Sequence, residues 1–284
     1  MNVSPPAFAP DAAHLARKAA ALDARLAGLG SVIVAYSGGV DSALVAVAAT
    51  RILGSRALCI TADSPSYPER HRDLAIGVAR AFDLQHEFIR TAEVDRAEYR
   101  ANPANRCYYC KHELYTQLTT IARARGFAAV ADGSNADDRG DYRPGRQAAR
   151  EFGVVSPLDE ADLAKDEIRA LAQRAGLSIW DEPASACLSS RIPYHSEVTP
   201  EKLRMIERGE SALHALGFRV CRVRHHDRIA RLEIGRDEMA RAIEPAIADA
   251  IDRELRAIGY EHIVLDLRGY RSGSLNDALR LRPV

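Results

Sequence analysis

The stretch Val32-Ile33-Val34-Ala35-Tyr36-Ser37-Gly38-Gly39-Val40-Asp41-Ser42 decides the fold of the first half of the chain. Its apolar beginning predicts a short buried strand, and the alanine-rich residues that follow it predict a helix. The two glycines between them allow a tight turn and a close approach of a ligand to the backbone. The first N–H groups of the helix, with the positive end of its dipole, then face an anion. The stretch therefore predicts a phosphate-binding loop.

Polar side chains in this loop indicate a metal as well. Ser37 and Ser42 supply hydroxyl donors, whereas Asp41 brings a carboxylate close to the phosphates. Such a carboxylate is unfavourable there unless a cation such as Mg²⁺ lies between the negative groups. We therefore expect a site for a magnesium nucleotide, and the alternative is a strand-to-helix turn that merely uses glycine and serine as turn and cap residues.

Strands and helices alternate on both sides of the loop. Strands are predicted near residues 32–37, 57–62, 86–90 and 128–132, and helices over about residues 12–29, 40–53, 68–82 and 113–125. This alternation predicts an α/β fold with a parallel, doubly wound sheet. Ligands bind at the carboxyl ends of such strands, so the loops 37–42, 61–64 and 132–138 are expected to share one rim.

The pattern changes in the last third of the chain. A helix over about residues 165–175 and an irregular stretch to Tyr194 come first. A helix near 200–216, strands near 220–224, 230–234 and 263–267, and helices across 237–258 follow. We expect a mobile leader over residues 1–11, a nucleotide-binding domain with the cysteine loops over 12–194, and a smaller α+β domain for substrate binding or oligomerisation over 195–284.

The composition narrows the class of protein. Hydrophobic residues make up 47% of the 284 residues, which is typical of a soluble globular protein. No apolar stretch approaches the roughly 20 residues of a membrane span, and the leader lacks the features of a signal peptide, so we expect a cytoplasmic protein with no membrane partner. Lys plus Arg and Asp plus Glu both number 39, and this balance argues mildly against an RNA partner without excluding a local basic patch.

Five cysteines are present, namely Cys59, Cys107, Cys110, Cys187 and Cys221. In a cytoplasmic protein they are metal ligands, reactive thiols or core residues rather than disulfides, and we expect the first and the last to pack in the core. Cys107 and Cys110 form a C-x-x-C pair, which occurs in zinc sites, redox motifs and iron-sulfur sites. A zinc site would need a fourth ligand such as His112 or His195, whereas three thiolates that include Cys187 suit a cluster with one open iron.

Several motifs resemble a known family. The loop Ser37–Ser42 resembles the PP-loop of ATP pyrophosphatases, which cleave ATP to AMP and pyrophosphate while they adenylylate a substrate. The further motifs are Asn102-Pro103-Ala104-Asn105-Arg106-Cys107, Asp132-Gly133-Ser134-Asn135-Ala136-Asp137-Asp138, Ala186-Cys187-Leu188-Ser189-Ser190-Arg191 and Gly269-Tyr270-Arg271-Ser272-Gly273-Ser274. Together they resemble LarE, the sulfur transferases that build the nickel-pincer nucleotide cofactor of lactate racemase. The similarity covers about residues 12 to 278.

This resemblance implies a reaction. ATP adenylylates a carboxylate of pyridinium-3,5-biscarboxylic acid mononucleotide, pyrophosphate leaves, and a sulfur nucleophile displaces AMP to give a thiocarboxylate. In one branch of the family the cysteine that matches Cys187 gives up its own sulfur and becomes dehydroalanine. In the other branch, cysteines that match Cys107 and Cys110 join it to hold a 4Fe-4S cluster with a replaceable sulfide.

All three cysteines are present, so we expect the cluster-dependent branch, with ATP, Mg²⁺ and a 4Fe-4S cluster as cofactors. The expected partners are the pyridinium mononucleotide and sulfide or another sulfur donor. The resemblance also implies a homo-oligomer such as a hexamer.

The resemblance and the position of each residue along the chain give a set of binding residues. They are Ala35, Ser37, Gly38, Gly39, Val40, Asp41, Ser42, Asp63, Ser64, Gly133, Asn135, Asp138, Arg222 and Arg224. Asp63 and Ser64 end a strand, where ribose or adenine contacts and a helix N-cap are equally expected. Arg222 and Arg224 share one face of a strand and are expected to bind the substrate phosphate, with a solvated strand face as the alternative.

Four residues are expected to take part in the chemistry, namely Cys187, Asp41, Arg191 and Glu210. Arg191 follows the cysteine loop, and its guanidinium fork suits a substrate phosphate, with an ordinary ion pair as the alternative. Glu210 matches a family position linked to the active site, although a glutamate on a helix surface is nearly as expected. His225 and His226 are adjacent on a strand and point opposite ways, so we do not expect a metal there.

Two other functions stay open. A PP-loop tRNA thiolase also combines ATP activation with a three-cysteine cluster. The absence of a basic excess and of paired zinc-ribbon cysteines, and the motifs around Cys187 and Arg271, favour the small pyridinium substrate. The third possibility is a module that senses ATP or binds zinc without turnover.

Overall fold

The computed structural model describes residues 11–140, 143–183, 186–271 and 273–276. The expected leader lies outside these ranges except for its last residue, Asp11. The helices are α1 (Ala12–Leu29), α2 (Val40–Leu53), α3 (Glu69–Ala81), α4 (Ala97–Arg100), α5 (Arg106–Arg125), α6 (Gly145–Glu151), α7 (Pro157–Glu160), α8 (Lys165–Arg174), α9 (Pro200–Ala215), α10 (Met239–Ala242) and α11 (Pro245–Ile258). The strands are β1 (Val32–Ala35), β2 (Ala57–Asp63), β3 (His86–Arg90), β4 (Ala129–Ala131), β5 (Cys221–His226), β6 (Ile229–Ile234) and β7 (His262–Leu265). Short 3-10 turns are η1 (Gly54–Arg56), η2 (Glu93–Asp95), η3 (Ala136–Gly140), η4 (Leu188–Arg191) and η5 (Ser274–Asn276).

The chain divides into two compact units. The first unit contains residues 1–63, 70–91 and 111–182, and the second contains 64–69, 92–110 and 183–284. The division therefore differs from the expected single boundary at residue 195. Backbone hydrogen bonds within the second unit explain the difference, because His195 N donates to Asn102 O and Val198 N donates to Arg100 O.

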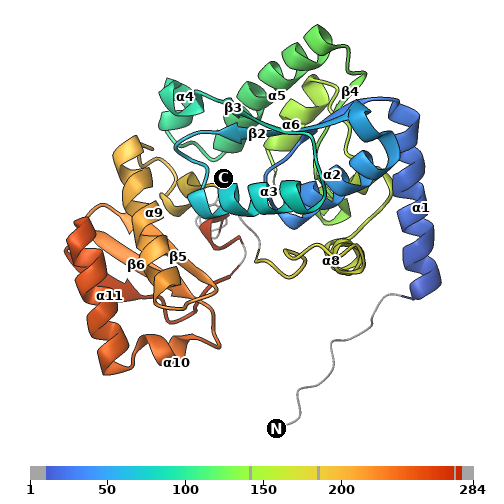
Figure 1. Cartoon of the computed structure of the whole chain (residues 1–284). Helices are drawn as coiled ribbons and strands as arrows, with labels where there is room; N and C mark the ends of the chain where they lie inside the picture. Colours follow the sequence, from blue (N-terminus) through green and yellow to red (C-terminus); the bar gives the residue numbers. More distant parts are fainter. Residues whose placement is uncertain (1–10, 141–142, 184–185, 272, 277–284) are drawn as a thin grey trace. The chain divides into compact units, whose positions relative to one another are not determined.

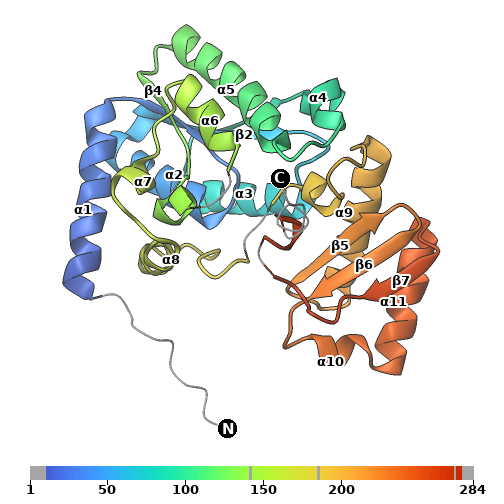
Figure 2. The same cartoon turned by 180° about the vertical axis from the view of Figure 1, so that it is seen from behind.

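The first unit is built on a parallel sheet with the strand order β3-β2-β1-β4. Strand β1 is buried along its whole length and pairs with β2 on one side and β4 on the other. Helices α5 and α6 lie on one side of the strands and α2 and α3 on the other (Figures 1 and 2). The expected doubly wound α/β fold is therefore confirmed.

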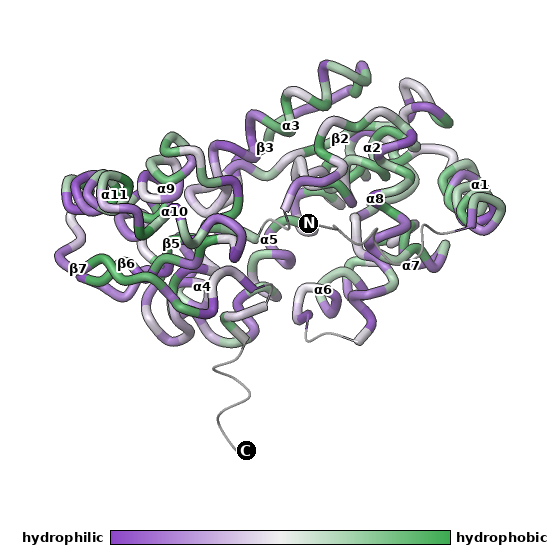
Figure 3. The backbone as a smooth tube through the Cα atoms, turned by 90° about the horizontal axis from the view of Figure 1, so that it is seen from below, coloured by the Kyte–Doolittle hydropathy of each residue, from purple (hydrophilic) through white to green (hydrophobic). Residues whose placement is uncertain are grey.

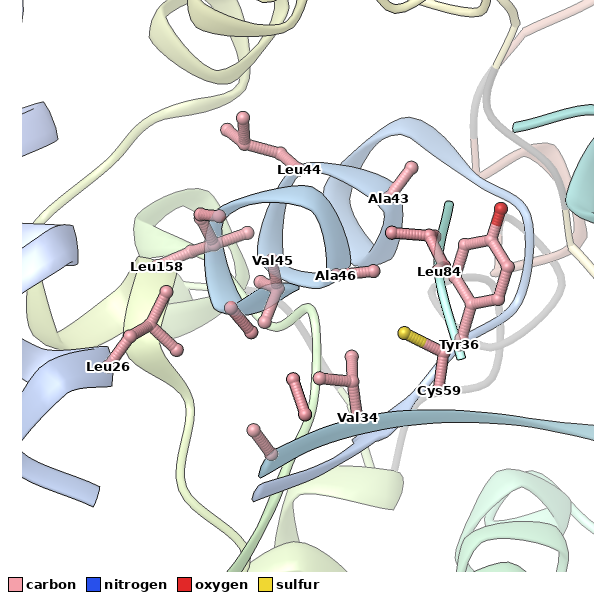
Figure 4. Packing of buried hydrophobic residues seen from close by; sticks show 14 of the residues in the cluster. Leu26, Val34, Tyr36, Ala43, Leu44, Val45, Ala46, Cys59, Leu84 and Leu158 are labelled. Atoms are coloured by element: carbon pink, nitrogen blue, oxygen red, sulfur yellow. The ribbon is translucent and has the colours of Figure 1, made fainter. Parts of the chain in front are cut away.

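Alternate side chains of β1 supply the core on the α2 side. Val32 and Val34 pack in one cluster with residues from α1 and α2, including Leu26 and Val45 (Figure 4). Cys59 belongs to the same cluster, and burial raises the pKa of its thiol to about 12. It is therefore a packing residue, as predicted, because it is fully buried among apolar side chains.

Helix α1 is amphipathic and covers this core with its apolar face. Its buried residues Leu15, Leu22 and Leu26 recur at helical spacing. The hydropathy colours of α1 accordingly include both hydrophobic and hydrophilic residues around its turns (Figure 3). The helix begins after Asp11, whose carboxylate accepts a hydrogen bond of 3.2 Å from Ala13 N.

The strand order places a switch point beside β1. The chain leaves β1 to form β2 and then β3 on one side, and returns later to form β4 on the other side. The loops after β1 and β4 consequently lie at one edge of the sheet, where doubly wound folds bind their ligands. A Cβ added to Gly133, in the loop after β4, would lie 2.8 Å from Ser42 N. The two loops therefore meet in space as the sequence predicts.

The second unit contains a three-stranded sheet with the order β5-β6-β7. Strands β5 and β6 are antiparallel, and β6 and β7 are parallel. Apolar residues of α9 and α11, including Leu213 and Leu255, pack with Val223 and Leu232 in one cluster on the sheet. Cys221 belongs to this cluster, and burial raises the pKa of its thiol to about 12. The smaller α+β part is therefore present.

Helix α5 begins at Arg106, seven residues before the expected start at Glu113. Backbone hydrogen bonds from Arg106 N to Pro103 O and from Tyr108 N to Asn105 O start the helix early. The C-x-x-C pair is therefore helical. Cys107 and Cys110 lie three positions apart at the helix start, where residues at this spacing share one side.

None of the helices in the described ranges is long and apolar enough to cross a membrane.

We predict that Gly133→Ala lowers the free energy of unfolding by about 1–3 kcal/mol, because its Cβ would overlap the backbone of Ser42 and Asp41. ATP binding should weaken with it, since the same loop would have to move. The matched control is Gly140→Ala, because no atom of the described residues lies within 4 Å of a Cβ added at this position. Chemical denaturation measures both variants, and equal stabilities would contradict the close approach of the two loops.

Candidate functional site

The loop after β1 is held by hydrogen bonds of Ser42. Its hydroxyl donates to Gly39 O at 3.0 Å and accepts from Ser37 N at 3.1 Å. The two serine hydroxyls also lie 3.1 Å apart. Ser42 is buried and thus shapes the loop, whereas Ser37 is exposed.

Two glycines leave the start of α2 open. Gly38 has φ of +72°, and a Cβ there would lie 2.8 Å from His71 O. Gly39 is the N-cap residue of α2 and makes no side-chain cap hydrogen bond. The first N–H groups of a helix have no acceptor inside the helix, so this end can bind an anion. Ala35 and Val40 flank the loop and are buried, so only their backbone can contact a ligand.

Asp41 lies in the first turn of α2 and pairs with a lysine of the same unit. Its Oδ2 is 2.5 Å from Lys165 Nζ, at the start of α8. Its Oδ1 is buried and has no hydrogen-bond partner in the described part of the chain. A buried oxygen without a donor suits a cation ligand, and the carboxylate fits the expected Mg²⁺ on this ground.

The loop after β4 brings further carboxylates to this edge. Asp138 Oδ2 accepts from Asn135 N at 3.0 Å, and its Oδ1 lies 2.9 Å from Arg143 Nη2. Burial raises the pKa of Asp138, and the nearby charge of Asp41 contributes in the same direction. Arg143 opposes this rise. A carboxylate whose pKa is raised beside a second carboxylate is typical of a site that takes up a cation.

Asp63 and Ser64 have protein partners instead of open side chains. Asp63 forms an ion pair with Arg72 of α3, and both belong to the first unit. Ser64 belongs to the second unit, where its hydroxyl donates to Glu93 Oε1 at 2.5 Å. Their backbone stays at the carboxyl end of β2, where nucleotide contacts were expected.

The three cysteines of the expected cluster all belong to the second unit. Cys107 is exposed, and Cys110 and Cys187 are half-buried. Cys187 and Cys107 both act electrostatically on Arg106, and Cys187 and Cys110 both act on Tyr99. Arg106 is therefore influenced by Cys107 and Cys187, and Tyr99 by Cys110 and Cys187.

These thiols do not form a closed ligand set. Across residues 11–140, 143–183, 186–271 and 273–276, no three His, Cys, Asp or Glu side chains come together as metal ligands. The zinc alternative finds no support at His112, whose ring packs on Phe152 with centroids 5.0 Å apart. The soft thiolate donors match an iron-sulfur site in chemistry.

The turn after Cys187 is clamped by Arg191, which is 2% exposed. Its Nη1 donates to Ala186 O at 2.6 Å and to Cys187 O at 3.0 Å. Its Nε and Nη2 donate to the two carboxylate oxygens of Glu210, both at 2.9 Å. Glu210 also accepts from Val223 N at 3.0 Å, so the pair joins the cysteine loop to β5.

Arg191 is therefore occupied inside the protein. Burial acts to raise the pKa of Glu210, but the charge of Arg191 outweighs it and the pKa is lowered. Because the guanidinium fork faces this carboxylate, it has no second fork for a substrate phosphate. The observed contact of Arg191 with Glu210 is the ion pair that the sequence analysis gave as the alternative.

Arg222 and Arg224 lie on the same face of β5. Arg224 is 6% exposed and donates to Ser190 O, Glu233 Oε2 and Ser274 Oγ, each at 2.7 Å. Its Nε is buried and has no hydrogen-bond partner among the described residues. The strand face is thus a buried polar site at this position and not a solvated surface.

Arg222 has an aromatic neighbour, and the pKa of its guanidinium is lowered. Its guanidinium carbon lies 5.2 Å from the ring centroid of Tyr270, in the expected C-terminal motif. Burial lowers the pKa of Arg222, and the like charge of Arg191 adds to this effect. An anion between these arginines would relieve their repulsion. Ser272 of the same motif lies outside the described residues.

The sequence did not point to several residues of these sites. Lys165 was expected only as the start of a helix. A lysine at a helix N-terminus opposes the dipole, which is a signal for a nearby carboxylate. Arg106 was part of a motif without a role, and Glu93 and Glu233 are buried acids whose partners are remote in sequence. Only the tertiary structure shows these partners.

His225 packs in the core of the second unit. Its Nδ1 lies 3.1 Å from Tyr260 Oη, and it is 3% exposed, whereas His226 is exposed. The two rings thus point to opposite faces, as predicted. Burial lowers the pKa of His225 to about 4, and the charge of Lys202 adds to this.

The fold and the glycine loop define a PP-loop protein, a class that binds ATP. Comparison with known proteins narrows the class. A pyridinium-3,5-bisthiocarboxylic acid mononucleotide synthase of Lactiplantibacillus plantarum is 37% identical over 268 residues, which cover 94% of this chain and 96% of the relative. The chain belongs to the LarE family of ATP-dependent sulfur-transferring enzymes.

Other similarities agree with this family. An uncharacterised protein of Synechocystis sp. is 43% identical over 251 residues, which cover 88% of this chain and 94% of the relative. A tRNA-specific 2-thiouridylase of Streptomyces griseus is 31% identical over 196 residues, but these cover only 54% of this chain and 51% of the relative. No model of a protein family matches the chain.

We predict that Glu210→Gln lowers the free energy of unfolding by about 3–5 kcal/mol, because it leaves the buried charge of Arg191 without its counter-ion. The matched control is Glu201→Gln, which breaks an exposed pair with Arg204 and should leave the stability nearly unchanged. Urea unfolding measures both. Similar losses in the two variants would show that the buried pair does not hold the Cys187 turn.

We predict that His225 makes the second unit less stable in acid. The pKa of His225 is lower in the folded state than in the unfolded state. Between pH 6.5 and about 4, His225 is therefore protonated in the unfolded state and neutral in the folded state. The free energy of unfolding therefore falls as the pH falls through this range. His225→Phe should flatten that slope, and His262→Phe, at an exposed position, should not. Equal slopes in urea titrations would contradict this assignment.

Proposed function

We propose that the protein uses ATP to adenylylate carboxylates of pyridinium-3,5-biscarboxylic acid mononucleotide and converts them to thiocarboxylates. One observation carries this proposal: a glycine loop open for ATP and the three free cysteines Cys107, Cys110 and Cys187 within one compact unit occur on a single chain. The near full-length similarity to a synthase of the bisthiocarboxylic product supports the same substrate. The product would serve the nickel-pincer cofactor of lactate racemase, and we place the reaction in the cytoplasm.

The first unit would carry the activation step. The N–H groups at the start of α2 and the hydroxyl of Ser37 would bind the phosphate chain of ATP, and Gly133, Asn135 and Asp63 at the end of β2 would line the nucleotide. Asp41 and Asp138 would hold Mg²⁺, which would offset the negative charge of the phosphates. Lys165 neutralises Asp41 when no cation is present.

The sulfur step follows from the chemistry of the adenylate. A carboxylate resists attack because oxide is a poor leaving group, whereas the adenylate releases AMP. A sulfur nucleophile attacks the carbonyl carbon, the C–S bond forms, and the C–O bond to phosphate breaks with its electron pair on AMP. A site that excludes water protects the adenylate from hydrolysis.

Cys187 would present the sulfur. We propose that Cys107 and Cys110 join it to hold a 4Fe-4S cluster, since a hydrogen bond from Arg106 Nη1 to Ser189 O joins the start of the C-x-x-C helix to the turn after Cys187. When bound, such a cluster supplies a replaceable sulfide at an iron without a protein ligand. The alternative is that Cys187 gives up its own sulfur.

The second unit would also bind the substrate phosphate. Arg222 and the unpartnered Nε of Arg224 offer charge and a donor on one strand face. Arg191 and Glu210 are positioning residues in this proposal, because they clamp the turn after Cys187. We also propose a homo-oligomer, on the family resemblance alone.

The activation step has a direct test. ATP, Mg²⁺ and the pyridinium substrate should give AMP and pyrophosphate, and Asp41→Asn should lower this rate by at least about tenfold because the metal loses a ligand. Asp249→Asn, an exposed position on α11, is the control and should keep the rate. Tight, salt-sensitive binding of bulk tRNA in a filter assay, without turnover of the pyridinium substrate, would favour a tRNA thiolase.

The source of the sulfur needs a separate measurement. After anaerobic reconstitution, iron and sulfide should be present in the wild type and lost in Cys107→Ala, Cys110→Ala and Cys187→Ala, whereas the core variant Cys59→Ala keeps them. The cluster is excluded if only Cys187→Ala is inactive and the wild type loses the mass of one H₂S in turnover. That result would establish the sacrificial route.

A further inference from the structure

The residue before the phosphate loop is held by three hydrogen bonds. Tyr36 follows β1 directly and packs in the core of the first unit, where it is 2% exposed (Figure 4). Its backbone N–H donates to Ile60 O at 2.9 Å, and its hydroxyl donates to Ala75 O in α3 at 3.1 Å. Its carbonyl accepts a hydrogen bond of 2.7 Å from the hydroxyl of Thr61 in β2. Both β2 and α3 therefore fix the entrance to the loop.

The carbonyl of Tyr36 determines how the next peptide group is turned. The peptide bond between Tyr36 and Ser37 is trans, so its C=O and its N–H point in opposite directions. The C=O faces Thr61, whereas the N–H of Ser37 donates to Ser42 Oγ at 3.1 Å. Ser42 in turn donates to the carbonyl of Gly39, the N-cap residue of α2. Through one peptide plane, Thr61 thus supports the serine that shapes the phosphate loop.

His86 of β3 is the far end of this chain of hydrogen bonds. Its Nε2 lies 2.8 Å from Thr61 Oγ1. A hydroxyl group has a single proton to donate, and Thr61 uses it for Tyr36 O. The Thr61 oxygen must therefore accept from His86, so Nε2 carries the proton. The imidazole packs against the rings of Tyr36 and Phe88, with centroids 5.2 and 4.6 Å away, and these contacts hold it in place.

We propose that Thr61 is a positioning residue for ATP binding, and that His86 keeps its hydroxyl in the orientation that this role requires. The hydrogen bonds run in one direction, from the ring of His86 to the hydroxyl of Ser42. Bonds in such a chain polarise and strengthen one another. Thr61 would act through the peptide after Tyr36 and not by contact with the nucleotide. This inference rests on the ATP-binding part of the proposed function.

The direction of the chain can be measured in the wild-type protein without nucleotide. Nitrogen NMR of the full chain with labelled histidines distinguishes protonated from unprotonated ring nitrogens. At about pH 8 the ring of His86 is neutral, because burial lowers its pKa from the ordinary value. We expect a protonated Nε2 and an unprotonated Nδ1, in the resonances that disappear in His86→Gln. Any other pattern overturns the proposal, since Thr61 would then not accept from His86.

Binding of ATP with Mg²⁺ tests the positioning role. In Thr61→Val the Kd for ATP should rise by about tenfold, the effect of one lost hydrogen bond. Thr61→Ser keeps the hydroxyl and should bind ATP as the wild type does. The matched control is Thr50→Val in α2, which removes a buried hydroxyl that has no hydrogen-bond partner among the described residues. This control should keep the Kd of the wild type.

The outcomes separate the role of Thr61 from the proposed function. A wild type that binds no ATP refutes the activation step of the proposed function itself. Normal ATP binding by Thr61→Val overturns only the positioning role. Equally weak binding by Thr61→Ser does the same, because it would show that Thr61 contributes by packing and not by its hydroxyl. If Thr61→Val does not fold, the ring nitrogens of His86 in the wild type still test the proposal.

Discussion

The unsatisfied N–H groups at the start of α2 are the constraint on which the first unit depends. Gly39 caps the helix without a side-chain acceptor, so the positive helix end stays open. Gly38 and Gly133 make this possible because a Cβ at either position would overlap neighbouring backbone. The parallel strands then bring Asp41 and Asp138 to the same edge, and Lys165 balances their charge. The unit is organised around a loop that can bind an anion and carboxylates that can bind its cation.

In the second unit, buried arginines bind the backbone close to Cys187. Arg106, Arg191 and Arg224 are buried, and each uses some of its donors to hold backbone carbonyls close to Cys187. Arg191 has a complete set of acceptors, whereas Arg106 and Arg224 each keep one buried N–H without a partner in the described structure. Buried cations with incomplete hydrogen bonding are costly, and they are typical of sites that receive an anion. This difference is the basis for proposing Arg191 as a positioning residue and Arg224 as a binding residue.

Local patterns predicted much of this arrangement. The strand at 86–90 and the helix at 12–29 have the expected bounds. The spacing of their apolar residues and the turn residues beside them are properties of the local sequence, so they can be recognised without the tertiary structure. The start of α5 was expected seven residues too late, since hydrogen bonds around Asn105 begin the helix before its apolar pattern does. The boundary at residue 195 was expected from a change in pattern, but the contacts of Asn102 and Arg100 with the later segment are not visible in a sequence.

The sequence by itself determined the class of fold, the phosphate loop and the family, because glycine spacing, strand period and motifs are local properties of the chain. The tertiary structure decided what each charged side chain does. It pairs Arg191 with Glu210, Lys165 with Asp41 and Asp63 with Arg72, although these partners lie far apart in sequence. The physical reason is that the role of a charge depends on its burial and on the groups around it, and both are set only when distant segments pack together.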